Sequence, residues 1–134
     1  MARIGYVIVS EDVYGSDREL IIKNPLNSIS PYSLPGNFSF VIAFSIIDLI
    51  RDTSYHLTIE LKDPNKKDVI QKQELDFSYN PPPQVAEKVK SGAMNLAFNN
   101  VVFKQEGIHT LTVSVTGGNS HSIEILVHPS GDKE

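Results

Sequence analysis

Apolar and polar residues alternate along much of this chain with a period of two, which is the spacing of side chains on the two faces of a β-strand. Segment 38–46 places its bulky apolar residues at even positions and smaller residues between them. The bulky set is Phe38, Phe40, Ile42, Phe44 and Ile46. Segment 55–61 repeats the pattern with Tyr55, Leu57, Ile59 and Leu61. Each segment therefore predicts a strand with one face in a core.

Further strands are predicted on either side of turn signals. Residues 4–9 and 19–23 are rich in isoleucine and valine or leucine, and they flank the polar run "EDVYGSD", which predicts a turn. The run "DPNKKD" at 63–68 has Pro64 in the position that a type I turn favours. A return strand is predicted to follow it, over 69–77.

Two segments rich in proline connect these strands. Residues 24–36 contain three prolines, each of which removes a backbone donor, so an extended connection between two sheets is predicted. Residues 80–92 begin with Asn80 and three consecutive prolines. Because Pro83 and Gly92 suit the two ends of a helix, at most one short helix is predicted near 84–90.

The chain closes with three alternating segments at 94–103, 108–116 and 121–128. The last two predict a hairpin, because Gly117, Gly118 and Asn119 form a three-residue loop of the kind that needs a positive φ. This loop length brings the apolar rows of both strands to one face. It predicts that Val115 pairs with His121 and that His109 pairs with Val127.

Seven to nine short strands with turn signals about every dozen residues predict an all-β fold. Each strand has one bulky side to bury, and a second sheet is the layer that buries it. We therefore expect an antiparallel, two-sheet, immunoglobulin-like sandwich. Its 134 residues fit a single domain, residues 1–134.

Composition excludes several classes of protein. The 16 acidic and 12 basic residues give a net charge of −4, and no basic stripe with interleaved aromatic residues is present, so no nucleic-acid partner is expected. No stretch approaches the roughly 20 apolar residues that cross a bilayer, so no membrane partner is expected. The chain has no cysteine and its first residues do not read as a signal peptide, which favours the cytoplasm.

The histidines and acids give no pattern of a catalytic or metal site. No HxH or HExxH spacing occurs, and His109 and His121 are predicted to lie too far apart along their hairpin to share a metal. The run Asp63, Asn65, Asp68 lacks the ligands of a calcium loop and is interpreted as a turn. Acid pairs, serines and glycines show no hydrolase or phosphate-binding arrangement. We therefore expect no catalytic residue, no metal, no cofactor and no enzymatic activity.

His109 has the parity of Leu111 and Val113, so it is predicted to point into the core at the start of its strand. The spacing of "QEGIHTL" at 105–111 is that of the tyrosine corner of immunoglobulin-like domains, with His109 in place of the tyrosine. A ring nitrogen that bonds a nearby backbone group would replace the tyrosine hydroxyl. We interpret His109 as a structural corner residue.

Several segments together resemble a group of small, uncharacterised bacterial proteins with an immunoglobulin-like sandwich, a domain of unknown function. The resemblance spans about residues 2–127 and rests on Asn24-Pro25, "LPGNFSF" (34–40), Tyr55-x-Leu57-x-Ile59, Asp63-Pro64 and "NLAFNNVVFKQEGIHTLTV" (95–113). Members of the group tend to have an aromatic or similar residue at the position of His109. The resemblance implies a fold but no activity, cofactor or partner.

The leading hypothesis for function is a non-enzymatic interaction module that contacts another protein through its loops or through an exposed sheet edge. The predicted contact residues lie in or beside the two proline-rich segments: Tyr32, Pro35, Tyr79, Pro81, Pro82 and Pro83. An edge strand could equally pair two copies into a homodimer. The alternative is a carbohydrate- or small-ligand-binding module that uses Tyr32 and Tyr79 together with these segments.

Overall fold

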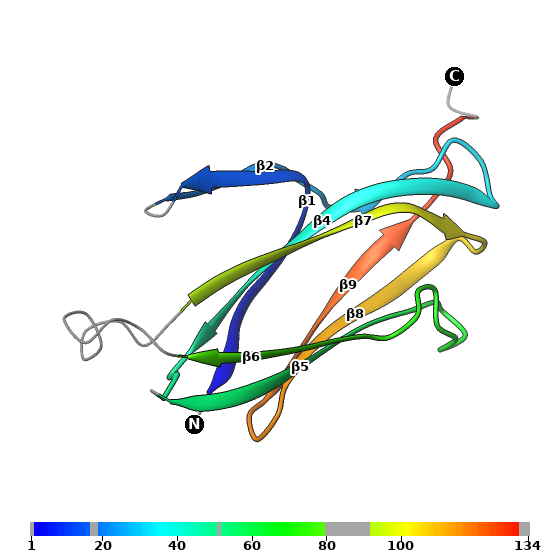
Figure 1. Cartoon of the computed structure of the whole chain (residues 1–134). Coiled ribbons are helices and arrows are strands. Elements are labelled where there is room, and N and C mark those ends of the chain that lie inside the picture. Colours follow the sequence, from blue (N-terminus) through cyan, green and yellow to red (C-terminus); the bar gives the residue numbers. More distant parts are fainter. Residues whose placement is uncertain (1, 17–18, 51, 80–91, 132–134) are drawn as a thin grey trace.

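The chain forms a two-layer sandwich of nine strands in a computed structural model that describes residues 2–16, 19–50, 52–79 and 92–131 (Figure 1). The strands are β1 (Arg3–Ser16), β2 (Glu19–Pro25), β3 (Ser28–Ile29), β4 (Gly36–Ile47), β5 (Thr53–Lys62), β6 (Gln73–Tyr79), β7 (Gly92–Phe103), β8 (Gly107–Val115) and β9 (Ser120–Val127). The predicted all-β sandwich is confirmed. Among the described residues, no helix could span a membrane.

The strands divide into a four-stranded sheet, in the order β2-β1-β4-β7, and a five-stranded sheet, in the order β3-β9-β8-β5-β6. Neighbouring strands are antiparallel except β3 and β9, which are parallel over two residues. Segment 24–36 leaves β2, adds β3 to the other sheet and returns to β4. The proline-rich connection therefore runs between the two sheets, as predicted.

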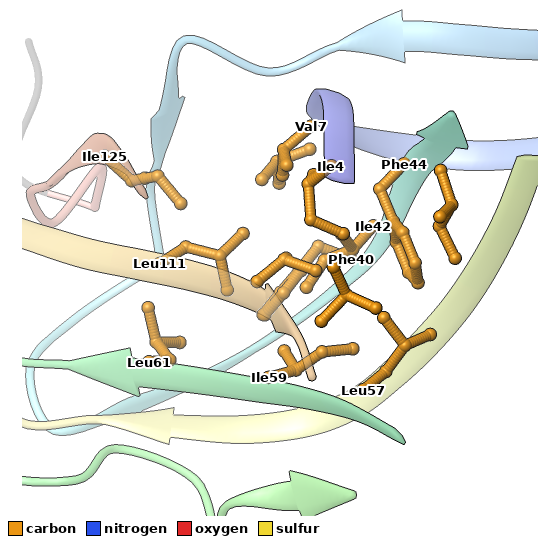
Figure 2. Packing of buried hydrophobic residues seen from close by; sticks show 14 of the residues in the cluster. Ile4, Val7, Phe40, Ile42, Phe44, Leu57, Ile59, Leu61, Leu111 and Ile125 are labelled. Carbon is orange, nitrogen blue, oxygen red and sulfur yellow. The ribbon is translucent and has the colours of Figure 1, made fainter. Parts of the chain in front are cut away.

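The core lies between the inward rows of the two sheets (Figure 2). Apart from Phe38, the predicted rows of β4 and β5 are buried, and each residue in them is at most 7% exposed. They are Phe40, Ile42, Phe44, Ile46, Tyr55, Leu57, Ile59 and Leu61. Burying one such side chain contributes about 1.5–3 kcal/mol to stability. Phe38 shares their parity but is only half-buried, because a β-bulge interrupts the register between Phe38 and Phe40.

The predicted turn at "EDVYGSD" is wrong for most of that run, because β1 continues to Ser16. Its first half pairs with β4 and its second half with β2, and the second half forms a two-stranded ribbon that projects from the body (Figure 1). Tyr14 pairs with Ile21 in this ribbon. Pairing with β2 thus satisfies the backbone N–H and C=O groups of a run that the sequence alone predicts to be a turn.

The return strand after the turn at 63–68 starts later than predicted, at Gln73. The turn itself is closed by the Asp63 carboxylate, whose Oδ1 accepts hydrogen bonds from the backbone N–H groups of Asn65 (2.8 Å) and Lys67 (3.0 Å). Because this acid is used as a turn acceptor, the solvated-turn interpretation fits better than a calcium loop. The predicted helix near 84–90 lies outside the described residues.

The predicted faces of the β8–β9 hairpin are correct, but the predicted register is two residues off. Val113, not Val115, pairs with His121, and Ile125, not Val127, pairs with His109. The loop has three residues as predicted, but it comprises 116–118 and is closed by the Val115 N–H bond to Asn119 O (3.3 Å). A contact with the other sheet favours this register, since Asn119 Oδ1 accepts a hydrogen bond from Ile4 N–H (2.6 Å).

Candidate functional sites

The residues predicted for partner or ligand contact that the structure describes are not gathered in one place. Tyr32 is 78% exposed in the β3–β4 connection, and Pro35, which follows Leu34 through a cis peptide bond, is exposed nearby. The main chain of Tyr79 pairs with Thr53, at the opposite end of the sandwich (Figure 1). Pro81, Pro82 and Pro83 lie outside the described residues. Tyr32 and Tyr79 therefore cannot form one binding platform.

His109 is 1% exposed and lies on the inward face of β8. Its Nδ1 lies 3.1 Å from the carbonyl oxygen of Gly107, two residues earlier, and its ring meets the ring of Phe103 edge-on at 5.6 Å. Because a carbonyl only accepts, Nδ1 donates this bond. The contact is of the kind proposed for a corner residue. It leaves Nε2 buried without a hydrogen-bond partner among the described residues.

His121 lies on β9, four residues from the partner of His109. Four residues of strand span about 13 Å, which is too far for two ligands of one metal. Among the described residues, no three histidines or acids are grouped so that they could hold a metal ion.

A cavity of about 240 Å³ lies at the end of the sandwich where the β5–β6 and β7–β8 connections meet. One side of its lining comes from the connection after β5: Asp63, Asp68 and Val69. The other side comes from the end of β7 and the turn after it: Val102, Lys104 and Gln105. His109 completes the lining. Sequence analysis did not predict this site, because the two connections are about forty residues apart in the chain.

An ion pair supports the acidic side of the cavity. Lys62 Nζ lies 2.6 Å from Asp68 Oδ1 and 3.9 Å from Glu60 Oε2. The hydrogen bond to Asp68 raises the pKa of the Lys62 ammonium above its usual range. Lys62 therefore remains charged and holds Asp68 against the end of β5.

A second polar cluster lies on the outer face of the five-stranded sheet. His56 of β5 is flanked by two acids of β6, with Nδ1 2.5 Å from Asp76 Oδ1 and Nε2 2.8 Å from Glu74 Oε1. The bond to Asp76, followed by the bond to Glu74, raises the pKa of His56 above 6.5. The alternation at 55–61 places His56 on the polar face of its strand, but it does not identify the partners of His56, because they depend on the β5–β6 register. The side chains of the cluster are partly to mostly exposed, and none of them lines the cavity.

This pKa shift predicts a pH dependence of stability. A raised folded-state pKa adds stability that is fully present below the unfolded value near 6.5 and is lost as pH rises through the folded value. Replacing both acids, Glu74→Gln with Asp76→Asn, should lower the pKa of His56 toward 6.5. The variant should therefore lack the decrease in the free energy of unfolding that the wild type shows as pH rises through the folded-state pKa of His56. NMR titration of the His56 ring and denaturant unfolding at several pH values would measure both.

The control for that experiment is Glu124→Gln, which removes one acid from the outer face of β9 without touching His56. We expect this variant to leave the pKa of His56 unchanged. An unchanged His56 pKa in the Glu74→Gln, Asp76→Asn variant would contradict the assigned contacts.

The outer edge of β7 is the third candidate site. β7 is a 12-residue strand at the end of the four-stranded sheet, and no other strand in the described parts of the chain pairs with its outer edge. From Gly92 to Phe98 it follows β4 in an unbroken register. Met94, Leu96 and Phe98 pack their side chains against the core, while Ala93, Asn95 and Ala97 are exposed. Sequence analysis predicted a strand here but could not assign it to an edge.

Comparison with known proteins adds a family assignment. A search among curated proteins found no match to this chain. Residues 5–128 match the family described as "Family of unknown function (DUF6941)". The match covers both sheets, from the first residues of β1 to the residue after β9. The chain therefore belongs to this family of unknown function.

Proposed function

We propose that this protein is a non-enzymatic interaction module whose contact surface is the outer edge of β7, with which no described strand pairs. The observation that carries the proposal is that all 12 residues of β7 are uncharged and none is proline. Unpaired N–H and C=O groups along a sheet edge pair readily with another strand, and proteins usually prevent this with charges, prolines or short strands. The N-terminal part of β7 has none of these devices.

The other sheet edges differ from β7 in this respect. β6 carries Glu74 and Asp76, β2 carries Lys23 and ends at Pro25, and β3 has only two residues. β9 carries Glu124 and is covered at one end by β3. Charge and length thus protect these edges while β7 keeps a neutral one, which supports β7 as the pairing edge.

The partner that fits this edge is a second copy of the chain. In a symmetric pair, β7 meets the same residues of the other copy, so any charge on β7 would face a like charge at close range. β7 has no such charge. Antiparallel pairing centred on Leu96 would place Met94 opposite Phe98 and extend the apolar layer from one copy into the next. Two four-stranded sheets would then join through main-chain bonds.

Lysines on the exposed face of β7 test this proposal. The double variant Ala93→Lys, Ala97→Lys adds two charges at exposed positions, so the folded monomer keeps its core. In the pair centred on Leu96, position 97 lies opposite Asn95, so the lysine introduced there is a diagonal neighbour, at roughly 7–8 Å, of positions 93 and 97 of the other copy. We expect the dissociation constant of the wild-type dimer to rise at least about tenfold, which sedimentation over a concentration series would measure.

The matched control is Gln71→Lys, Gln73→Lys, which adds the same charge at exposed positions near the start of β6. It should dimerise like the wild type. A wild-type chain that stays monomeric throughout the series would overturn the proposal. So would an Ala93→Lys, Ala97→Lys variant that dimerises as well as the control.

We also propose a non-enzymatic role because His56, the histidine with a raised pKa, lies on an exposed sheet face rather than in the cavity. The bond from His109 to Gly107 supports an immunoglobulin-like sandwich with a histidine in the corner position. The cysteine-free sequence supports a cytoplasmic location. A ligand site built on Tyr32 and Tyr79 is not proposed, since these residues lie at opposite ends of the sandwich.

A further inference from the structure

The cavity between the β5–β6 and β7–β8 connections has the chemistry of a ligand site that is independent of the β7 edge. Its volume of about 240 Å³ lies just below the range of roughly 300–1,000 Å³ that holds drug-sized ligands, so an occupant must be small. Polar and charged side chains make up most of its lining, and two valines add apolar surface. The positions of these groups define what it can bind.

The deepest polar group is the imidazole of His109. Nδ1 is used by the bond to Gly107, and in the neutral ring Nε2 is then an acceptor that no described residue satisfies. A buried acceptor without a partner destabilises the fold. Nε2 itself is closed off by its surroundings, so His109 forms a closed wall of the cavity and a ligand's donors must be met by other groups.

The side that follows β5 adds further acceptors. Asp63 uses Oδ1 to close its own turn, and Asp68 uses Oδ1 to bind Lys62. No hydrogen bond among the described residues uses the second carboxylate oxygen of either acid. The two acids thus provide two acceptors, which can bind two of the three N–H donors of one ammonium group.

The opposite side carries a positive charge. Lys104 is exposed and makes no ion pair within 4.0 Å among the described residues, and Gln105 beside it offers an amide N–H₂. Val69 lies on the acidic side and Val102 on the basic side, so each charged wall has an apolar neighbour. Acid and base thus face the same small space without pairing with each other.

We propose that this cavity binds a small zwitterion, with a primary ammonium group and a carboxylate on a short apolar skeleton. The ammonium donates to Asp63 and Asp68, and the carboxylate accepts from Lys104 and Gln105. The skeleton packs on Val69 and Val102. Free amino acids have this chemistry. Charge-assisted bonds at both ends give the selectivity, because a molecule with only one charged end leaves one wall unsatisfied.

The test uses the full chain and four probes of similar size. L-Alanine and 4-aminobutyrate carry both charges at different spacings, ethylamine carries only the ammonium, and propionate carries only the carboxylate. Binding is followed by NMR through the His109 Nε2 signal and the Lys104 and Gln105 amides. We expect at least one zwitterion to give a saturable shift at all three residues, with an affinity at least about tenfold above both single-charge probes.

Two variants locate the site. Lys104→Gln removes the unpaired cation at an exposed position and should lower zwitterion affinity about tenfold or more. Lys72→Gln removes an exposed cation that does not line the cavity and should bind like the wild type. The proposal is overturned if neither zwitterion outbinds ethylamine and propionate, or if Lys104→Gln and Lys72→Gln bind equally well. Dimerisation through β7 is measured separately, so either proposal can fail alone.

Discussion

Replacing Phe44 with alanine is expected to lower the free energy of unfolding by about 3–5 kcal/mol, the range for a phenylalanine removed from a packed core. Phe44 is 0% exposed and lies on β4, the strand that pairs with both β1 and β7. Its ring fills space between the two sheets (Figure 2). Alanine would leave a cavity that neighbours on both sides cannot close, since two paired strands hold β4 in place. Denaturant unfolding with a comparison of slopes would measure the loss.

Two further variants keep this result interpretable. Phe44→Leu removes less volume and should cost about 1–2 kcal/mol, so it reports on the site even if the alanine variant does not fold. Ile50→Ala removes an apolar side chain that is 55% exposed and should change stability by about 0.5 kcal/mol or less. Equal losses in Phe44→Ala and Ile50→Ala would contradict the assigned core.

The strands and their buried faces could be predicted because the side-chain period of a strand is two. Alternation alone assigns Leu57 and Ile59 to the inside and Thr58 to the outside. It also assigns the correct faces to the β8–β9 hairpin, since a shift of two residues preserves parity. The same property explains the error in register: alternation cannot distinguish shifts of two, and the contact between Asn119 and Ile4 from the other sheet favours one of them.

The candidate sites depend on which strands become neighbours, and the sequence pattern does not report that. The β7 edge is an edge only because β4 is its sole neighbour in the described sheet. The cavity brings Asp68 and Lys104 together from different connections. His109 is the exception. Its burial follows from parity, and its local bond follows from the need of a buried ring nitrogen for a partner, so both could be anticipated.

The contact that sets the hairpin register leads to the second large effect, which we expect for Gly118→Ala. A β-carbon at Gly118 would lie 2.0 Å from the carbonyl oxygen of Ala2 and 2.7 Å from Val115 Cγ1. A backbone oxygen cannot rotate away as a flexible side chain can, so the hairpin tip must move off β1. That movement also weakens the bond between Ile4 N–H and Asn119 Oδ1. Strain and the weakened bond together should cost about 2–4 kcal/mol.

The adjacent glycine provides the matched control. Gly117 has φ of +75°, and a β-carbon there would have no atom within 4 Å. Gly117→Ala therefore meets only the backbone penalty of a left-handed conformation, about 1–2 kcal/mol. Denaturant unfolding of the two variants separates steric contact with the N-terminal strand from conformational strain within the loop. A Gly118→Ala chain as stable as Gly117→Ala would mean that the hairpin tip does not pack against Ala2. The contact between Asn119 and Ile4 would then no longer explain the register of the β8–β9 hairpin.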